Sequence, residues 1–325
     1  GRPDRLADAS QTPGRGAAVG SHRRPLPRRA RPIHADPDVA RPDLPSQQQA
    51  AGPLTVEVVR GVDQLRDAIL ELRRAGHSIG FVPTTGLIHS GQLSLVQRAR
   101  QTDGAVVVSN QADPAGAATE EERLLALVER EGVDVAFLPG HGTVDPPHVT
   151  RITVDGLTGR LEGASRPGYL DEVATTIMKL LHLVGPAHLY LGQKDGQRVV
   201  VIRRMLADLF VNVELVVCPV MRDPDGLAVS AANMGLSIEE RHAATCLYAA
   251  ISAAEAAYDS GERSAEVLRA RMTERIGAEP LARVDYVTVA DGESLAELSR
   301  LEGPALAMAA VWIGRVRLTD SVLLG

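Results

Sequence analysis

Aromatic residues, cysteines and long hydrophobic runs are scarce in this chain of 325 residues. Aromatics make up 3% of the chain and hydrophobic residues 44%, so its core must consist mainly of Leu, Val, Ile and Ala. Cys218 and Cys246 fit no disulfide or metal framework, and we expect both to be buried. No apolar run reaches the roughly 18 residues of a membrane span. These absences predict a soluble protein in the reducing cytoplasm, without a membrane partner.

Lysine is also scarce. Lys179 and Lys194 are the only lysines among 35 lysine and arginine residues. In a chain whose basic residues are almost all arginines, a lysine indicates a position that requires an ammonium group. An ammonium is a compact charge, whereas a guanidinium is planar and donates hydrogen bonds in fixed directions. Lys194 lies in a motif described below.

The charge of the chain is unevenly distributed. The formal net charge of −6 gives no indication of nucleic-acid binding. Residues 1–53 hold nine of the 20 prolines and nine arginines, but no lysine or glutamate. This segment has no hydrophobic periodicity, and it lacks the apolar stretch of a signal peptide. We therefore predict that residues 1–53 form a disordered Arg/Pro-rich extension.

From residue 54 onward, short hydrophobic runs alternate with amphipathic segments. The runs predict strands at 54–59, 78–82, 105–109, 133–138, 188–191 and 211–217. The amphipathic segments predict helices at 62–75, 92–100, 120–131, 173–184 and 197–209. Buried strands that alternate with helices indicate an α/β fold with a parallel sheet covered on both faces. In such folds ligands bind beyond the carboxyl ends of the strands, so we expect the site in the loops after Val82, Ser109 and Leu191.

The pattern changes after residue 220. Helices are predicted at 237–260 and 264–276, and short strands at 284–289, 305–312 and 317–318. This arrangement predicts a smaller α+β domain. The expected organisation is therefore the extension at 1–53, a nucleotide-binding domain at 54–220 and a smaller domain at 221–325.

The most informative motif is Phe81-Val82-Pro83-Thr84-Thr85-Gly86-Leu87-Ile88-His89-Ser90-Gly91-Gln92. It begins as a buried strand, passes through a small-residue turn and continues as a helix. The first N–H groups of a helix lack internal partners, so this geometry favours an anion site. His89 adds a donor that can meet phosphate charge.

Three further loops carry candidate ligands. Tyr190-Leu191-Gly192-Gln193-Lys194-Asp195 places a cation at a helix start, where Asp195 is expected to cap the helix. The loop 223–233 is rich in small residues that allow close approach to a ligand. The loop 161–169 carries Arg166, whose forked side chain suits a carboxylate or phosphate. Taken singly, each is also typical of an ordinary turn or a solvated surface.

Together, these four segments resemble the pantothenate synthetase (pantoate–β-alanine ligase) family from about residue 54 to residue 325. The resemblance rests on Phe81-Val82-Pro83-Thr84, Leu161-Glu162-Gly163-Ala164-Ser165-Arg166-Pro167-Gly168, Gly192-Gln193-Lys194-Asp195 and Asp225-Gly226-Leu227-Ala228. It implies a Rossmann-like sheet of the nucleotidyltransferase type. The implied reaction joins pantoate to β-alanine through a pantoyl adenylate, with ATP and Mg²⁺ as cofactors. It also implies a cytoplasmic homodimer.

The resemblance assigns roles to individual residues. The catalytic residues would be His89, Gln92 at the family's proton-donor position, and Lys194. The substrate acid would meet Gly116, Arg166 and Arg198, and metal ligands stay unknown. The nucleotide would meet Thr85, Gly86, His89, Gln92, Gly192, Gln193, Lys194, Asp195, Met221, Val229, Ser230, Ala231 and Ala232.

Several of these residues depart from the family pattern. Gln92 stands where the family has a second histidine, and glutamine can donate a hydrogen bond but cannot carry the proton or positive charge of a histidine. Gly116 and Arg198 stand at glutamine positions that bind pantoate, and Ala232 replaces a phosphate-binding arginine. Each lost contact costs on the order of 2–4 kcal/mol in the transition state. Two alternatives therefore stay open: a diverged paralogue that adenylates another small acid, and a catalytically impaired binding or regulatory homologue.

Overall fold

The computed structural model describes residues 56–111, 117–140, 142–144 and 148–325. All of them belong to one compact unit, Pro42–Gly325. The predicted extension at 1–53 therefore lies outside the described residues. So do Leu54 and Thr55, the first two residues of the first predicted strand.

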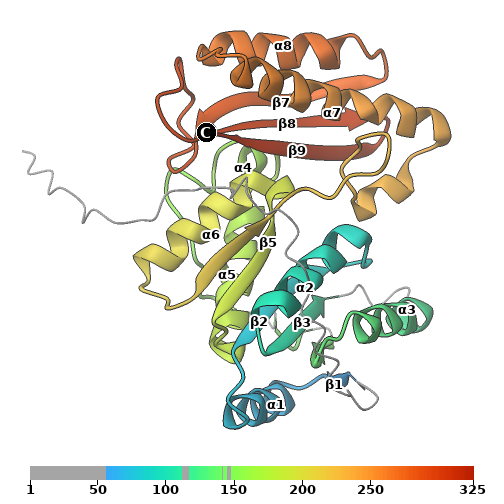
Figure 1. The fold of residues 1–325 in the computed structure, drawn as a ribbon, viewed down its shortest axis with the longest axis vertical. Coiled ribbons are helices and arrows are strands. Elements are labelled where there is room, and N and C mark those ends of the chain that lie inside the picture. The colour runs from blue at the N-terminus through green and yellow to red at the C-terminus, as the bar shows by residue number, and fades with distance from the viewer. Residues whose placement is uncertain (1–55, 112–116, 141, 145–147) are drawn as a thin grey trace, which may run out of the picture. The chain divides into compact units, whose positions relative to one another are not determined.

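Six parallel strands form the larger sheet, in the order β1-β4-β3-β2-β5-β6 (Figure 1). Its strands are β1 (Glu57–Val59), β2 (Ile79–Thr85), β3 (Ala105–Gln111), β4 (Val135–Phe137), β5 (His188–Gly192) and β6 (Glu214–Cys218). The strand order changes direction between β2 and β5, because β3 and β4 lie on one side of β2 and the later strands on the other. A ligand site is expected at the carboxyl edge of this switch point.

Helices cover both faces of this sheet, as the sequence predicts. They are α1 (Val62–Arg74), α2 (Ser90–Thr102), α3 (Ala117–Arg130), α4 (Glu162–Ser165), α5 (Tyr169–Val184) and α6 (Gly196–Asp208). Neighbouring residues of one strand point to opposite faces. Phe81 therefore joins the core beneath α1, α5 and α6, whereas Val82 joins the core beneath α2 and α3. The predicted α/β class is confirmed.

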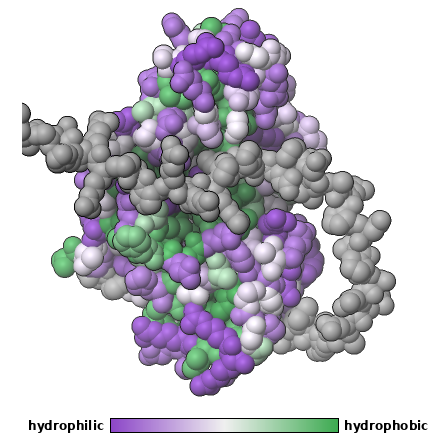
Figure 2. Space-filling model, turned by 60° about the vertical axis from the view of Figure 1, so that its left-hand side comes forward, coloured by the Kyte–Doolittle hydropathy of each residue, from purple (hydrophilic) through white to green (hydrophobic). Residues whose placement is uncertain are grey.

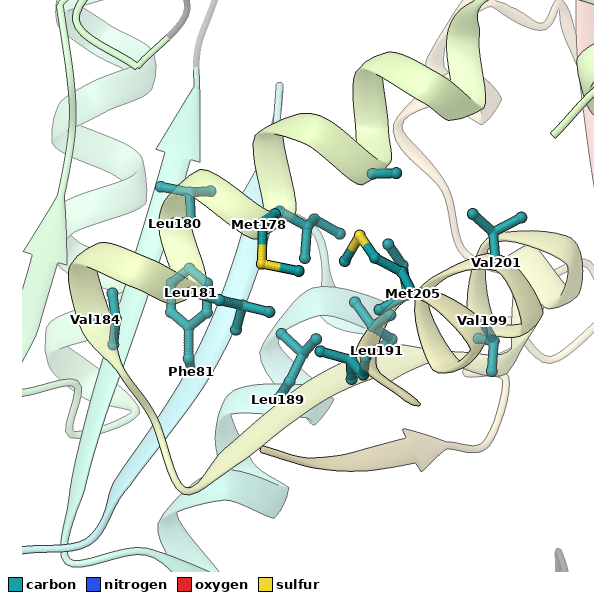
Figure 3. Close-up of a cluster of buried hydrophobic side chains, with 14 of the residues drawn as sticks. Phe81, Met178, Leu180, Leu181, Val184, Leu189, Leu191, Val199, Val201 and Met205 are labelled. Atoms are coloured by element: carbon teal, nitrogen blue, oxygen red, sulfur yellow. The ribbon is translucent and has the colours of Figure 1, made fainter. Parts of the chain in front are cut away.

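The core under α5 and α6 fixes these helices against β2 and β5. Figure 3 shows Met178 and Leu181 of α5, and Met205 of α6, facing Phe81 and strand β5. These side chains are almost fully buried. Each contributes roughly 1.5–3 kcal/mol of hydrophobic free energy relative to an exposed position. This packing sets where the first residues of α5 and α6 lie at the edge of the sheet.

A second sheet follows in the chain, with antiparallel strands in the order β7-β8-β9. Its strands are β7 (Ala282–Asp291), β8 (Ala305–Ile313) and β9 (Val316–Leu324), and its helices are α7 (Ile238–Asp259) and α8 (Ala265–Gly277). The helices pack on one face through a separate core that contains Cys246. Both cysteines are free and buried, as predicted.

The largest difference from the predicted elements concerns β9. The sequence predicts only residues 317–318, whereas the strand runs from Val316 to Leu324. The polar residues Thr319 and Ser321 interrupt the hydrophobic pattern by which a strand is predicted from sequence. In the structure they face other parts of the protein and not solvent. On the surface in Figure 2, hydrophilic residues prevail toward the two ends and hydrophobic ones lie mainly toward the middle. Within the described residues, the helices are too short or too polar to cross a membrane.

Candidate active site

A cavity of about 660 Å³ opens at the carboxyl ends of β2, β3 and β5. Its size suits a small-molecule ligand. Twelve of the predicted site residues line it: Thr85, His89, Gln92, Arg166, Gly192, Lys194, Asp195, Arg198, Met221, Val229, Ser230 and Ala231. Gly86, Gln193 and Ala232 are not on its wall. Gly116 lies outside the described residues.

Strand β3 holds the turn that leads from β2 to α2. Gly86 has φ of 66°, in the left-handed region that glycine enters without a steric penalty. Asn110 donates from Nδ2 to the Gly86 carbonyl oxygen at 3.0 Å, and the Gly86 N–H donates to the Gln111 carbonyl oxygen at 3.4 Å. These two contacts from β3 therefore fix the turn that precedes α2.

His89 is the N-cap of α2 and faces the cavity. Its Nδ1 atom is buried and has no hydrogen-bond partner in the structure. A buried nitrogen without a partner is costly, so this atom is available for a ligand or a water molecule. Burial lowers the pKa of His89 below its ordinary value, and the Lys194 ammonium lowers it further, against the opposing charge of Asp195. The imidazole is therefore neutral near pH 7.

The lowered pKa of His89 makes stability depend on pH. The unfolded chain binds a proton at the ordinary pKa of about 6.5, and the folded protein only at lower pH. We expect the free energy of unfolding to fall as the pH drops below about 6.5, because the unfolded state then binds more protons. Denaturation by urea at several pH values measures this. His89→Gln should flatten the dependence of the free energy of unfolding on pH. His182→Gln, at an exposed position, is the control and should not flatten it. Equal slopes in both variants would contradict the assignment of this pH dependence to His89.

Gln92 has a structural role at the start of α2. Its Oε1 atom accepts from the His89 N–H at 3.2 Å, and its Nε2 donates to the Thr85 carbonyl oxygen at 3.4 Å. Both ends of the amide are thus engaged with the backbone of the turn. The side chain closes the turn around His89, a role that requires no titratable proton.

A compact group of charges surrounds Lys194. Its Nζ lies 3.0 Å from Asp195 Oδ1, and the other oxygen of Asp195 lies 2.9 Å from Arg198. Burial disfavours the charged carboxylate, but the Arg198 and Lys194 charges outweigh burial and hold the pKa of Asp195 far below its ordinary value. Two cations and one anion leave one net positive charge on this wall of the cavity.

The prediction that the Asp195 side chain caps the following helix is wrong. Asp195 does occupy the N-cap position of α6, but its side chain makes no capping hydrogen bond. Two neighbouring cations attract the carboxylate more strongly than a backbone N–H does, because hydrogen bonds between charged groups are the stronger ones. Asp195 therefore orients Lys194 and Arg198.

Two arginines that line the cavity, Arg198 and Arg166, differ in their surroundings. Arg198 donates to the Tyr169 hydroxyl at 2.8 Å, and its Nε is buried without a partner. Arg166 pairs with Glu162 at 3.3 Å and stacks on the Tyr169 ring, with 49% of its side chain exposed. Both line the cavity, but only Arg198 presents a buried donor without a partner.

Sequence reasoning missed the residues that join this site to the second sheet. Arg317 of β9 bonds both oxygens of Glu162 at 2.9 and 2.7 Å, and it also pairs with Asp285 at 2.6 Å. The buried Gln197 accepts from the Glu162 N–H at 2.9 Å. These partners are more than 30 positions apart in the sequence, so no local pattern indicates them.

No group of three or more His, Cys, Asp or Glu residues suited to a metal ion occurs among the described residues. Within the cavity, Asp195, Glu162 and Asp320 are each paired with basic side chains. A divalent cation would therefore find few free protein oxygens on this part of the wall.

Fold and site together define an α/β protein with a nucleotidyltransferase-type sheet and, at its topological switch point, a cavity lined by His89, Lys194 and Arg198. The sequence model of the family described as pantoate-beta-alanine ligase matches residues 57–323. The chain belongs to the pantoate-beta-alanine ligase family.

Individual relatives agree with this assignment. A pantothenate synthetase from Acidobacterium capsulatum is 43% identical over 285 residues, which are 81% of this chain and 95% of the relative. The crystal structure of a pantothenate synthetase from Thermus thermophilus superposes with a TM-score of 0.75 at 36% identity, covering 82% of this chain and 99% of that one. The Francisella tularensis pantoate-beta-alanine ligase, complexed with Beta-gamma ATP and Beta-alanine, has a TM-score of 0.65 at 27% identity, covering 82% and 97%.

Proposed function

We propose that the cavity joins pantoate to β-alanine at the expense of ATP, giving pantothenate, AMP and pyrophosphate. The observation that carries this proposal is the cavity of about 660 Å³ in which a member of this ligase family gathers His89, Lys194 and Arg198. The structure of the Francisella relative with an ATP compound and β-alanine supports both of these ligands.

The proposed reaction has two steps. A carboxylate oxygen of pantoate attacks the α-phosphorus of ATP, and the bond to pyrophosphate breaks. The amine of β-alanine then attacks the carbonyl carbon of the pantoyl adenylate, loses a proton and displaces AMP. Neither step needs a covalent bond to the protein, so its task is to align the reactants and to stabilise the developing charge.

Lys194 and His89 are suited to the phosphate end of this reaction. Lys194 supplies the net positive charge of its group, and this charge acts on His89 at the start of α2. His89 is neutral, lines the same cavity and has a buried ring nitrogen without a partner. We propose that both contact the triphosphate, with Ser230 and the start of α2 beside them. Gln92 then holds the turn and does not donate a proton.

Mg²⁺ would enter this site with the nucleotide. The cavity carboxylates named above are occupied by arginines and lysine, so the phosphate oxygens and water would supply most of its ligands. When bound, the ion would neutralise phosphate charge.

Two measurements test this proposal. The chain should support growth of a pantothenate-requiring strain without added vitamin. The purified protein should exchange labelled pyrophosphate into ATP when pantoate is present and β-alanine is absent. No growth and no exchange would contradict the proposal. Binding of ATP–Mg²⁺ in calorimetry without exchange would instead favour the impaired homologue.

A second candidate is adenylation of a different small acid. Arg198 favours this candidate, because it stands at a glutamine position that binds pantoate in the family pattern. It supplies a charged side chain whose buried Nε has no partner, beside the Tyr169 hydroxyl. An exchange screen over small carboxylic acids discriminates the two candidates. The first predicts the fastest exchange with pantoate, and the second predicts a faster rate with another acid.

Gly91 should control the position of His89. A β-carbon at Gly91 would lie 3.0 Å from His89 Nδ1, closer than an ordinary contact. We expect Gly91→Ala to displace the ring and weaken ATP binding about tenfold, which corresponds to about 1.4 kcal/mol. Calorimetry measures the change. Gly277→Ala, where the new methyl group meets no atom within 4 Å, should leave the dissociation constant unaltered. An unaltered constant in Gly91→Ala would contradict the proposed contact.

Three further features stay predictions. We propose a domain boundary near residue 220, which the end of β6 at Cys218 and the separate core of the second sheet support. We also propose that the protein is a cytoplasmic homodimer. Sedimentation of the purified chain tests the dimer.

A further inference from the structure

Strand β9 reaches the loop that carries Lys194. Thr319 and Ser321 are two residues apart, so both point to the same side of the strand. Lys194 donates from Nζ to Thr319 Oγ1 at 3.2 Å, and Ser321 donates from Oγ to the Gln193 carbonyl oxygen at 2.5 Å. The second sheet thus holds the short helix η2 (Gln193–Asp195) at two points.

The hydroxyl of Thr319 has a defined direction. It accepts from Lys194 Nζ at 3.2 Å, and its proximity to Asp195 helps to lower the pKa of that carboxyl. An ammonium group only donates and an ionised carboxylate only accepts. The hydroxyl oxygen therefore accepts from Lys194, and its own proton stays free to turn toward the Asp195 carboxylate. Lys194 is therefore held by Asp195, which follows strand β5 of the first sheet, and by Thr319 of strand β9 in the second sheet.

We propose that Thr319 is a positioning residue for Lys194, which it holds in the orientation that the proposed ligation requires. A lysine side chain has four rotatable carbon bonds and about 2 kcal/mol of rotamer entropy, so a single ion pair restrains it loosely. Asp195 and Thr319 fix the ammonium in two directions and leave its remaining donor for the cavity. The kinetic part of this inference rests on the proposed function; the restraint of Lys194 does not.

The kinetic test removes the hydroxyl but keeps the shape of the side chain. We expect Thr319→Val to lower kcat about tenfold with a smaller change in the KM for ATP, because the charge stays in the cavity but is misplaced. Thr319→Ser should restore kcat to within about twofold. Thr273→Val, on the exposed side of α8, is the matched control and should be unaffected. A merely structural role would lower stability in Thr319→Val without this separation of kcat from KM.

The second test observes Lys194 directly and needs no turnover. Since Lys179 and Lys194 are the only lysines, ¹³C-labelled lysine gives two Cε signals, and Lys194→Arg identifies them. Carbon relaxation should show greater motion at Lys194 in Thr319→Val than in the wild type or Thr319→Ser, and no change at Lys179. If Thr319→Val does not fold, Thr319→Ala serves in both tests.

Unchanged motion at Lys194 in these variants would overturn the inference, whatever the enzyme does. Greater motion with unchanged kcat would also overturn it, because the restraint would then have no catalytic purpose. Greater motion at Lys194 in Thr319→Val, together with a wild-type protein that shows no ligase activity, would uphold the restraint while removing the proposed function.

Discussion

Replacing Lys194 by alanine is expected to lower kcat for ligation by about 10²–10³ while the protein stays folded. Loss of one preorganised charged donor in a transition state has this magnitude. Stability should change little, because Asp195 keeps Arg198 as its partner at 2.9 Å and does not become an unpaired buried charge. Steady-state rates and urea denaturation of the same preparation separate the two effects.

The other lysine provides the control. Lys179 belongs to α5 and donates to the Val144 carbonyl oxygen at 3.2 Å, so it is engaged outside the cavity wall. Lys179→Ala should keep kcat near the wild-type value. Equal rates for Lys194→Ala and the wild type would show that the charge of Lys194 does not act on the reaction.

Arg317→Met is expected to lower the free energy of unfolding by about 3–5 kcal/mol. Arg317 is only 11% exposed, and it is the shared partner of Glu162 and Asp285. Removing one member of a buried ion pair leaves uncompensated charge, which has a cost of this size. Glu162 of α4 would keep only its 3.3 Å pair with the half-exposed Arg166, and Asp285 of β7 would lose both of its hydrogen bonds from Arg317.

Two comparisons sharpen this expectation. Arg315→Met changes an exposed arginine of the same hairpin and should alter stability by less than about 0.5 kcal/mol. Adding Glu162→Gln and Asp285→Asn to Arg317→Met should recover much of the loss, because neutral amides do not repel each other. Urea denaturation measures all four proteins. No recovery would assign the loss to packing of the arginine stem instead of charge.

The sequence indicates the main sheet because its signals are local. Buried hydrophobic runs, amphipathic helices and small-residue turns repeat along residues 57–218, and the predicted strands and helices of this region all form. The motif around His89 likewise predicts a strand, a turn and the start of a helix within 12 residues. A site built from such loops can be placed at the edge of the sheet before the structure is known.

The contacts made by side chains are less predictable. Asp195 reads as a helix cap because the sequence does not show that Arg198 turns back toward it from the next turn of helix. Gln92 reads as a lost proton donor, whereas the structure shows an amide that closes the turn of His89. Arg317 and Thr319 carry no local signal, since their partners lie on another sheet.

The most direct test of the central claim is to measure AMP and pantothenate formed by the purified full chain from ATP, Mg²⁺, pantoate and β-alanine. The account predicts both products in equal amounts, no pantothenate when either substrate is omitted, and a rate that falls by about 10²–10³ in Lys194→Ala. AMP and pantothenate no higher than in Lys194→Ala would contradict it.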